Sequence, residues 1–174
     1  KLRQHLSPFM GEIEPATIVD HYRRWFPDAT ASRVFFSATT AARSWKGMVI
    51  ESQRRAEQRT RTWNYYVHWR SPADNGRWGA PHMVDIPLLF NTVDASIYTA
   101  GSPQAQKLAD QMSDALLAFA KTGDPNHRGL PIWPRFNLRQ RPAMIFDTKP
   151  QVILDPRRRE RLLFAKVPYL QPGT

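Results

Sequence analysis

The sequence of 174 residues contains no cysteine. Disulfides, a thiolate nucleophile and cysteine-ligated zinc are therefore excluded. The sequence also lacks the run of about 18 to 20 apolar residues that a membrane-spanning helix needs. Its longest apolar stretches, such as 86–90, have the length of a strand and contain proline. No apolar segment follows the charged N-terminus as in a secretory signal, although a mature chain would not show one either. We therefore expect no membrane partner.

The composition that is present is typical of a globular protein, with 41% hydrophobic and 23% charged residues. The length suits one domain with a sizeable core. The formal net charge of +10 would suit a nucleic acid or an anionic surface. The arginines are spread along the chain among acidic residues, and no nucleic-acid-binding motif accompanies them. We interpret them as solvated helix faces and expect no nucleic-acid partner.

Hydrophobic periodicity predicts several helices. We expect one over 16–25 with Pro15 in its first turn, and a short one that Thr30 caps. A separate, longer helix is predicted from Ala41. The clearest helix covers 104–121, which has a regular apolar stripe.

Strand signals are fewer. The segment 62–69 is rich in β-branched and aromatic residues on both faces, so we expect a strand buried on both sides. The segments 143–147 and 151–154 predict a short hairpin, after which Asp155 is expected to cap a last helix. The order predicts the α/β class, but a parallel sheet needs more strand–helix crossovers than this chain offers. The chain therefore reads as part of a larger fold.

The sequence lacks the motifs of several kinds of site. No serine lies in a Gly-x-Ser-x-Gly nucleophile elbow, and no Gly-x-x-x-x-Gly-Lys phosphate loop is present. The five histidines are far apart and none follows the His-Glu-x-x-His spacing of a zinc site. We predict neither a metal nor a cofactor.

The segment 79–90 carries one imidazole, that of His82, between a predicted strand and an apolar run. Loops at strand ends carry catalytic groups on a rigid scaffold, although a single histidine in a loop is more often structural. Asp85 follows three residues later. Its carboxylate could hold the imidazole, or it could cap the next turn.

The same segment resembles the catalytic-histidine segment of type-B carboxylesterases, the cholinesterase-like branch of the α/β hydrolases. The family pattern there is a small residue, histidine, two residues, an acid, isoleucine and an apolar run ending in phenylalanine. Further matches extend the resemblance over nearly the whole chain: the aromatic strand and Arg-Ser-Pro turn at 65–72, the Phe-Ala-x-x-Gly-Asp-Pro-Asn turn at 119–126, Trp133-Pro134 and 144–147.

The resemblance implies a role for His82 as the general base, which takes the proton of a serine and later protonates the leaving alcohol. It places Asp85 where the family has an acid after the histidine, and we interpret Asp85 as support for the loop and not as the triad acid. Met83 departs from the family, since many members have glycine there, and a bulkier side chain would alter the turn.

In α/β hydrolases the nucleophile and the acid precede the histidine. Upstream of His82 there is no nucleophile elbow, and the acidic residues show no family motif. The resemblance thus implies that 1–174 is the C-terminal portion of a carboxylesterase type-B domain, helix-rich with few strands. Hydrolysis of a small-molecule ester would need the N-terminal portion of the same enzyme, which carries the serine and the acid. We expect the isolated chain to be inactive.

Two other readings remain open at this point. Cholinesterase-like domains also serve as adhesion partners, so a non-catalytic interaction module is one alternative. A basic nucleic-acid-binding domain is the other, and only the net charge suggests it.

Overall fold

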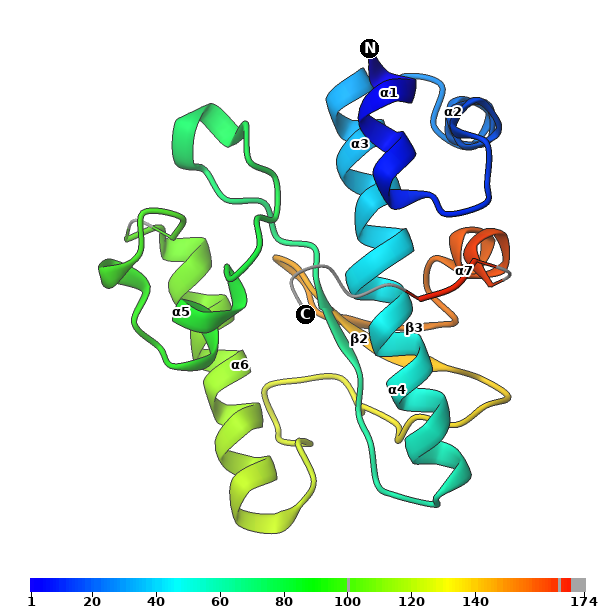
Figure 1. Ribbon diagram of the computed structural model, residues 1–174. Helices are drawn as coiled ribbons and strands as arrows, with labels where there is room; N and C mark the ends of the chain where they lie inside the picture. Colours follow the sequence, from blue (N-terminus) through cyan, green and yellow to red (C-terminus); the bar gives the residue numbers. More distant parts are fainter. Residues whose placement is uncertain (100, 166, 170–174) are drawn as a thin grey trace. The chain divides into compact units, whose positions relative to one another are not determined.

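The computed structural model describes residues 1–99, 101–165 and 167–169 (Figure 1). They form two compact units, one made of Lys1–Gln58 with Arg157–Thr174 and the other of Arg59–Pro156. Helices predominate, and the three strands form one sheet, in agreement with the predicted α/β class. Among the described residues no helix has both the length and the apolar character needed to cross a bilayer.

The first unit is helical. Its elements are α1 (Leu2–Leu6), η1 (Ser7–Phe9), α2 (Pro15–Trp25), α3 (Ala31–Thr40), η2 (Ala41–Trp45), α4 (Lys46–Glu57) and α7 (Arg158–Phe164). The predicted start of α2 at Pro15 is confirmed, and Ile18 and Tyr22 on this helix are fully buried. Their neighbours in the core include Val34 from α3 and Phe164 from α7. The last helix therefore completes a core that the first three helices begin.

The expected break before Ala41 is wrong, because α3, the π-helical turn η2 and α4 follow one another without interruption. Thr30 caps the beginning as predicted, and its side chain accepts a hydrogen bond from the backbone N–H of Arg33 at 3.2 Å. The hydroxyl of Thr39 donates to the carbonyl oxygen of Phe35 at 2.9 Å and so stays within the helix. No glycine or proline lies between Thr30 and Lys46 to stop the helix.

Asp155 does not cap the last helix. Its backbone N–H donates to the carbonyl oxygen of Arg141 at 3.0 Å and continues the pairing of the hairpin by one residue. The N-cap is Arg157, in the left-handed conformation with φ 57°, and the helix begins at Arg158. The prediction failed because the hydrogen bond of the hairpin takes priority over the local capping signal.

The second unit holds the sheet. Its strands are β1 (Tyr65–Val67), β2 (Pro142–Phe146) and β3 (Gln151–Leu154), in the order β1-β2-β3. β1 runs parallel to β2, with Tyr65 opposite Met144, and β3 runs antiparallel to β2. The hairpin is confirmed. The remaining elements are η3 (Ala73–Gly76), α5 (Asp85–Leu89), η4 (Val93–Ala95) and α6 (Pro103–Thr122).

The strand predicted over 62–69 is only three residues long, and its expected burial on both sides is wrong. Tyr65 is 36% exposed, and the two residues after it are half-buried. Within the described sheet β1 has a hydrogen-bonded neighbour on one side only, because β2 occupies the central position. Every residue of β2 is buried, so β2 is the inner strand that the pattern had assigned to β1.

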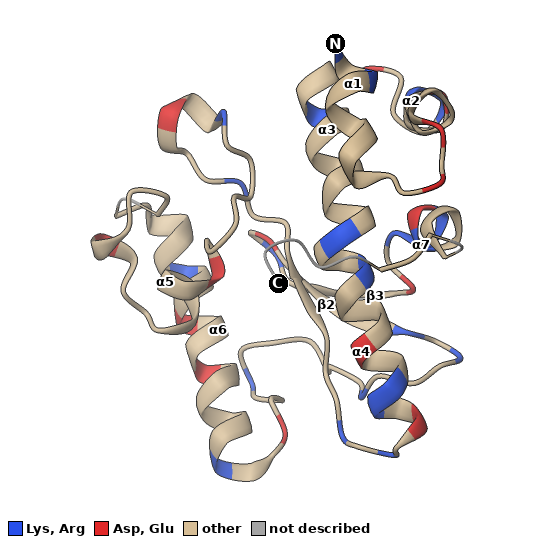
Figure 2. Ribbon diagram, in the orientation of Figure 1, with Lys and Arg blue, Asp and Glu red and all other residues tan. Residues whose placement is uncertain are grey.

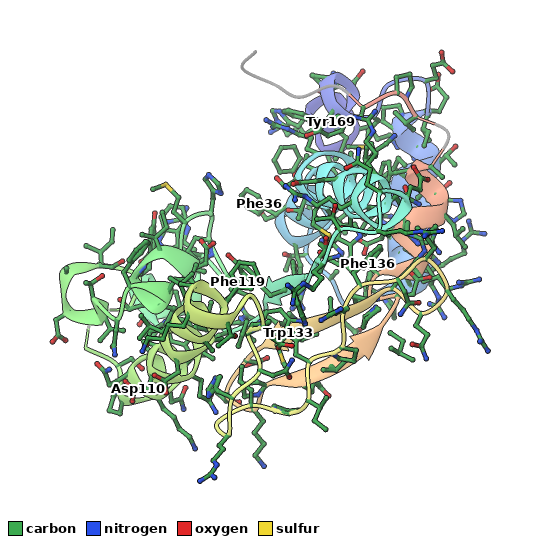
Figure 3. The ribbon with its side chains drawn as sticks, turned by 90° about the horizontal axis from the view of Figure 1, so that it is seen from below. Phe36, Asp110, Phe119, Trp133, Phe136 and Tyr169 are labelled. Atoms are coloured by element: carbon green, nitrogen blue, oxygen red, sulfur yellow. The ribbon has the colours of Figure 1, made fainter. Side chains whose placement is uncertain are left out.

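Helix α6 matches its prediction closely. The hydroxyl of Ser102 accepts from the backbone N–H of Ala105, and Gly123 ends the helix in the left-handed conformation with φ 72°. Leu108 and Met112 from the apolar stripe are buried in the core of this unit. Phe119 lies on the same helix (Figure 3) but is 45% exposed, and its ring meets that of Trp63 edge-on at 5.8 Å.

Candidate active site

His82 lies in the turn directly before α5, and its side chain is exposed. The backbone turns back twice before it: the N–H of Gly79 donates to the carbonyl oxygen of Gly76, and the N–H of Ser71 to that of Gly79. After His82 the N–H of Val84 donates to the carbonyl oxygen of Pro81 at 3.2 Å. The turn therefore presents the imidazole to solvent from a hydrogen-bonded backbone.

Met83, the residue after His82, has φ 70°. This left-handed region costs a side-chain-bearing residue roughly 1–2 kcal/mol, and glycine adopts it without that cost. The position where many family members carry glycine is thus one where the backbone of this chain favours glycine. The Met83 side chain is 54% exposed, so it fills no space that the core requires.

The core holds the other side of the turn. Val84 is 3% exposed and Leu88 is fully buried, and both pack in the cluster that contains Trp69. Beyond the end of α5, the side chain of Asn91 donates to Asp110 on α6 at 3.1 Å. His82 therefore sits next to an anchored helix although the imidazole itself is exposed.

Asp85 is the first residue of α5, and its carboxylate accepts a hydrogen bond from the hydroxyl of Tyr65 at 3.0 Å. Among the hydrogen bonds of the described residues none joins it to His82, and it makes no side-chain capping bond to α5. Of the roles considered for Asp85, support of the loop is the one that this contact fits. Burial, together with the nearby Asp85 carboxylate, raises the pKa of Tyr65, so the hydroxyl is a protonated donor at neutral pH.

A second imidazole was not singled out from the sequence. Nδ1 of His68 lies 2.9 Å from Oδ2 of Asp147, and both side chains are partly exposed. The two residues directly follow β1 and β2, where these strands end side by side in parallel. The side chains of His68 and Asp147 therefore meet just beyond Val67 and Phe146, the last residues that β1 and β2 pair. The predicted ends of 62–69 and 143–147 were the signal that could have found it.

Within 1–99, 101–165 and 167–169, no three histidine, aspartate or glutamate side chains gather closely enough to share a metal ion.

Residues 16–164 match the family model described as the carboxylesterase family. The chain belongs to this family.

Curated relatives match shorter stretches. The phenmedipham hydrolase of Pseudarthrobacter oxydans is 29% identical over 98 residues, which is 52% of this chain and 19% of the hydrolase. Carboxylesterase 3 of Pongo abelii is 51% identical over 39 residues, which is 20% of this chain and 7% of that protein.

Among solved structures, a carboxylesterase of Geobacillus stearothermophilus has a TM-score of 0.76 at 24% identity, over 92% of this chain and 34% of that one. An esterase of Clostridium hathewayi has a TM-score of 0.64 at 23% identity, over 96% of this chain and 32% of that one. The fold is thus that of part of an α/β hydrolase, and the chain spans about a third of the length of these structures.

Proposed function

We propose that these residues supply the triad histidine, His82, of a serine-type carboxylic-ester hydrolase that acts on a small-molecule ester. The observation that carries the proposal is the placement of His82, whose exposed imidazole stands on a turn that the core and the Asp85–Tyr65 hydrogen bond hold. A general base must be accessible to its reaction partner and carried by a well-defined backbone, and the exposed imidazole and the hydrogen-bonded turn support both.

In the proposed reaction the neutral imidazole of His82 takes the proton of a serine hydroxyl as the serine oxygen attacks the ester carbonyl. The resulting imidazolium gives this proton to the leaving alcohol, and an acyl-enzyme forms. In the second half His82 takes a proton from a water molecule as the water oxygen attacks the acyl carbonyl. It then returns this proton to the serine oxygen as the acyl–serine bond breaks, which releases the acid and restores the serine. The serine and the triad acid come from the N-terminal portion of the same enzyme, because no Gly-x-Ser-x-Gly lies in this sequence.

The test compares His82→Ala with His68→Ala in the full-length enzyme that contains these residues. Both histidines are exposed and belong to the same unit, so they form a matched pair. We expect His82→Ala to lower kcat/KM for a p-nitrophenyl ester by about 10³-fold or more, because a triad member is lost. His68→Ala should retain most of the activity.

The 174-residue chain by itself should not react with a fluorophosphonate probe, since it has no activated serine. Labelling of this chain, or an active His82→Ala enzyme, would show that the proposal is wrong.

A further inference from the structure

The hydrogen bond between Tyr65 and Asp85 joins two elements that flank the His82 turn. Tyr65 is the first residue of β1 and Asp85 is the first residue of α5. Only Met83 and Val84 separate Asp85 from His82 along the chain. A contact that holds Asp85 therefore anchors the chain close to the imidazole.

We propose that Tyr65 is a positioning residue for His82, whose hydroxyl fixes the histidine turn by holding Asp85 against strand β1. The inference rests on the proposed function of His82. It adds a residue that acts on the imidazole through Asp85.

The turn needs such a support because its backbone is strained. Met83 has φ 70°, and a residue with a side chain stays in that conformation only where the surroundings over-determine it. The buried side chain of Val84 is one anchor. The carboxylate of Asp85 is the second, and its hydrogen bond to Tyr65 ties the start of the short helix to strand β1. These two anchors, on the successive residues Val84 and Asp85, define the direction in which the turn enters α5.

Tyr65 is suited to this role because it is itself held. Its backbone pairs with Met144 across the parallel strands. Its ring meets that of Phe146 edge-on at 5.9 Å, and Phe146 is 2% exposed. The hydroxyl is thus presented by a sheet and not by a loop, which is the arrangement that holds a functional group most accurately.

The hydrogen bond from Tyr65 also determines the direction in which the Asp85 carboxylate points. Asp85 is the acid nearest to His82 in the sequence. While Asp85 accepts from Tyr65, its carboxylate is directed toward β1. Loss of the Tyr65 hydroxyl frees the carboxylate to turn toward other donors, and the imidazole three residues away is one of them. Tyr65 therefore keeps the imidazole available for the serine.

The experiment uses the full-length enzyme with the variants Tyr65→Phe, Asp85→Ala, the double variant and Asp85→Asn. We expect Tyr65→Phe and Asp85→Ala each to lower kcat by about tenfold with little change in KM, as for one lost hydrogen bond. The double variant should be no worse than the poorer single one, because both changes remove the same contact. Asp85→Asn keeps an acceptor oxygen and should retain most of the activity.

Tyr98→Phe is the matched control. It removes a hydroxyl from the same unit, and no hydrogen bond of that hydroxyl is found among the described residues. Its kcat should equal that of the wild type. Thermal unfolding of each variant separates a positioning effect from a loss of stability, since only the former lowers kcat at an unchanged melting temperature.

A wild-type kcat in Tyr65→Phe, or a double variant whose loss is the product of the two single losses, would overturn the inference. His82→Ala is measured in parallel. If His82→Ala is inactive while Tyr65→Phe is fully active, only this inference fails; if His82→Ala is active, the proposed function fails first.

Discussion

Glu160 on α7 is 4% exposed, and its carboxylate accepts hydrogen bonds from three side chains. It accepts from the hydroxyls of Tyr22 and Ser37 and from the guanidinium of Arg157. A buried charge is tolerated when its lone pairs are satisfied in this way. The Glu51–Arg55 pair on α4 offers the opposite case, since its side chains are 64% and 49% exposed.

The two glutamates predict very different losses of stability. Glu160→Ala removes the charge that neutralises the buried Arg157 guanidinium and the acceptor of two hydroxyls, and should lower the free energy of unfolding by about 3–5 kcal/mol. Glu51→Ala breaks an exposed pair between residues four apart and should cost less than about 1 kcal/mol. Urea unfolding of both variants measures the difference. Equal losses would mean that the network around Glu160 contributes no more than a surface pair.

For single residues, the sequence predicts where a functional side chain lies along the chain but not which other side chains it contacts. The turn with His82 followed from a local pattern, and the structure shows a turn there. The partners were not accessible in the same way, because the hydroxyl of Tyr65 lies 20 residues from Asp85 and that of Tyr22 lies 138 residues from Glu160. No spacing rule connects such residues, since the fold alone brings them together.

Among the secondary-structure elements, those whose signals are local were predicted best. Both ends of α6 carry a capping residue, Ser102 and Gly123, and the helix ends where they stand. β1 was predicted worst, because hydrophobicity on both faces does not say which strand takes the centre of the sheet. The continuous helix from α3 to α4 was predicted as two helices, whereas the hydroxyl of Thr39 bonds back to the carbonyl oxygen of Phe35 and Thr39 stays within the helix.

The ends of α6 give a prediction at this scale. Ser102→Ala removes the acceptor for the N–H of Ala105 and should cost about 1 kcal/mol. Gly123→Ala should also cost about 1 kcal/mol, through its positive φ alone. A Cβ on Gly123 would meet only the Arg61 guanidinium, at an ordinary contact distance of 3.8 Å.

Thermal unfolding followed by circular dichroism measures both α6 variants and their combination. The helix is about 30 Å long, so the two losses should add. A double variant no less stable than either single one would contradict this.

Across the whole molecule the +10 charge is not gathered on one element. In each unit lysines and arginines are interspersed with acidic residues along the ribbon (Figure 2). A field of this kind favours solubility more than binding to one polyanion. Ionisation of tyrosine at high pH should affect the stability of both units, because each unit contains a tyrosine whose pKa is raised.

Stability should fall as the pH rises above about 10, the ordinary pKa of tyrosine. Burial, aided by the charge of Glu160, raises the pKa of Tyr22 in the first unit, and burial with Asp85 raises that of Tyr65 in the second. Above pH 10 the unfolded chain then holds fewer protons than the folded one, so the free energy of unfolding decreases with pH. Below that pH both states hold these protons and the effect is absent.

Urea unfolding from about pH 8 to about pH 11 checks this. Tyr22→Phe should unfold more easily at neutral pH but lose less stability over the range, because one displaced tyrosine is gone. An unchanged slope in Tyr22→Phe would assign the pH effect to other groups.

Helix α7 belongs to the first unit but is separated from the other helices of that unit by the whole second unit in the sequence. This separation has a consequence for folding during translation. The helices that contain Tyr22 and Ser37 are translated well before Glu160 and Phe164, which complete their hydrogen bonds and their core. At the usual elongation rates of about 5–20 residues per second, the interval is roughly ten seconds. During that interval we expect these helices to hold an open core that a chaperone could bind.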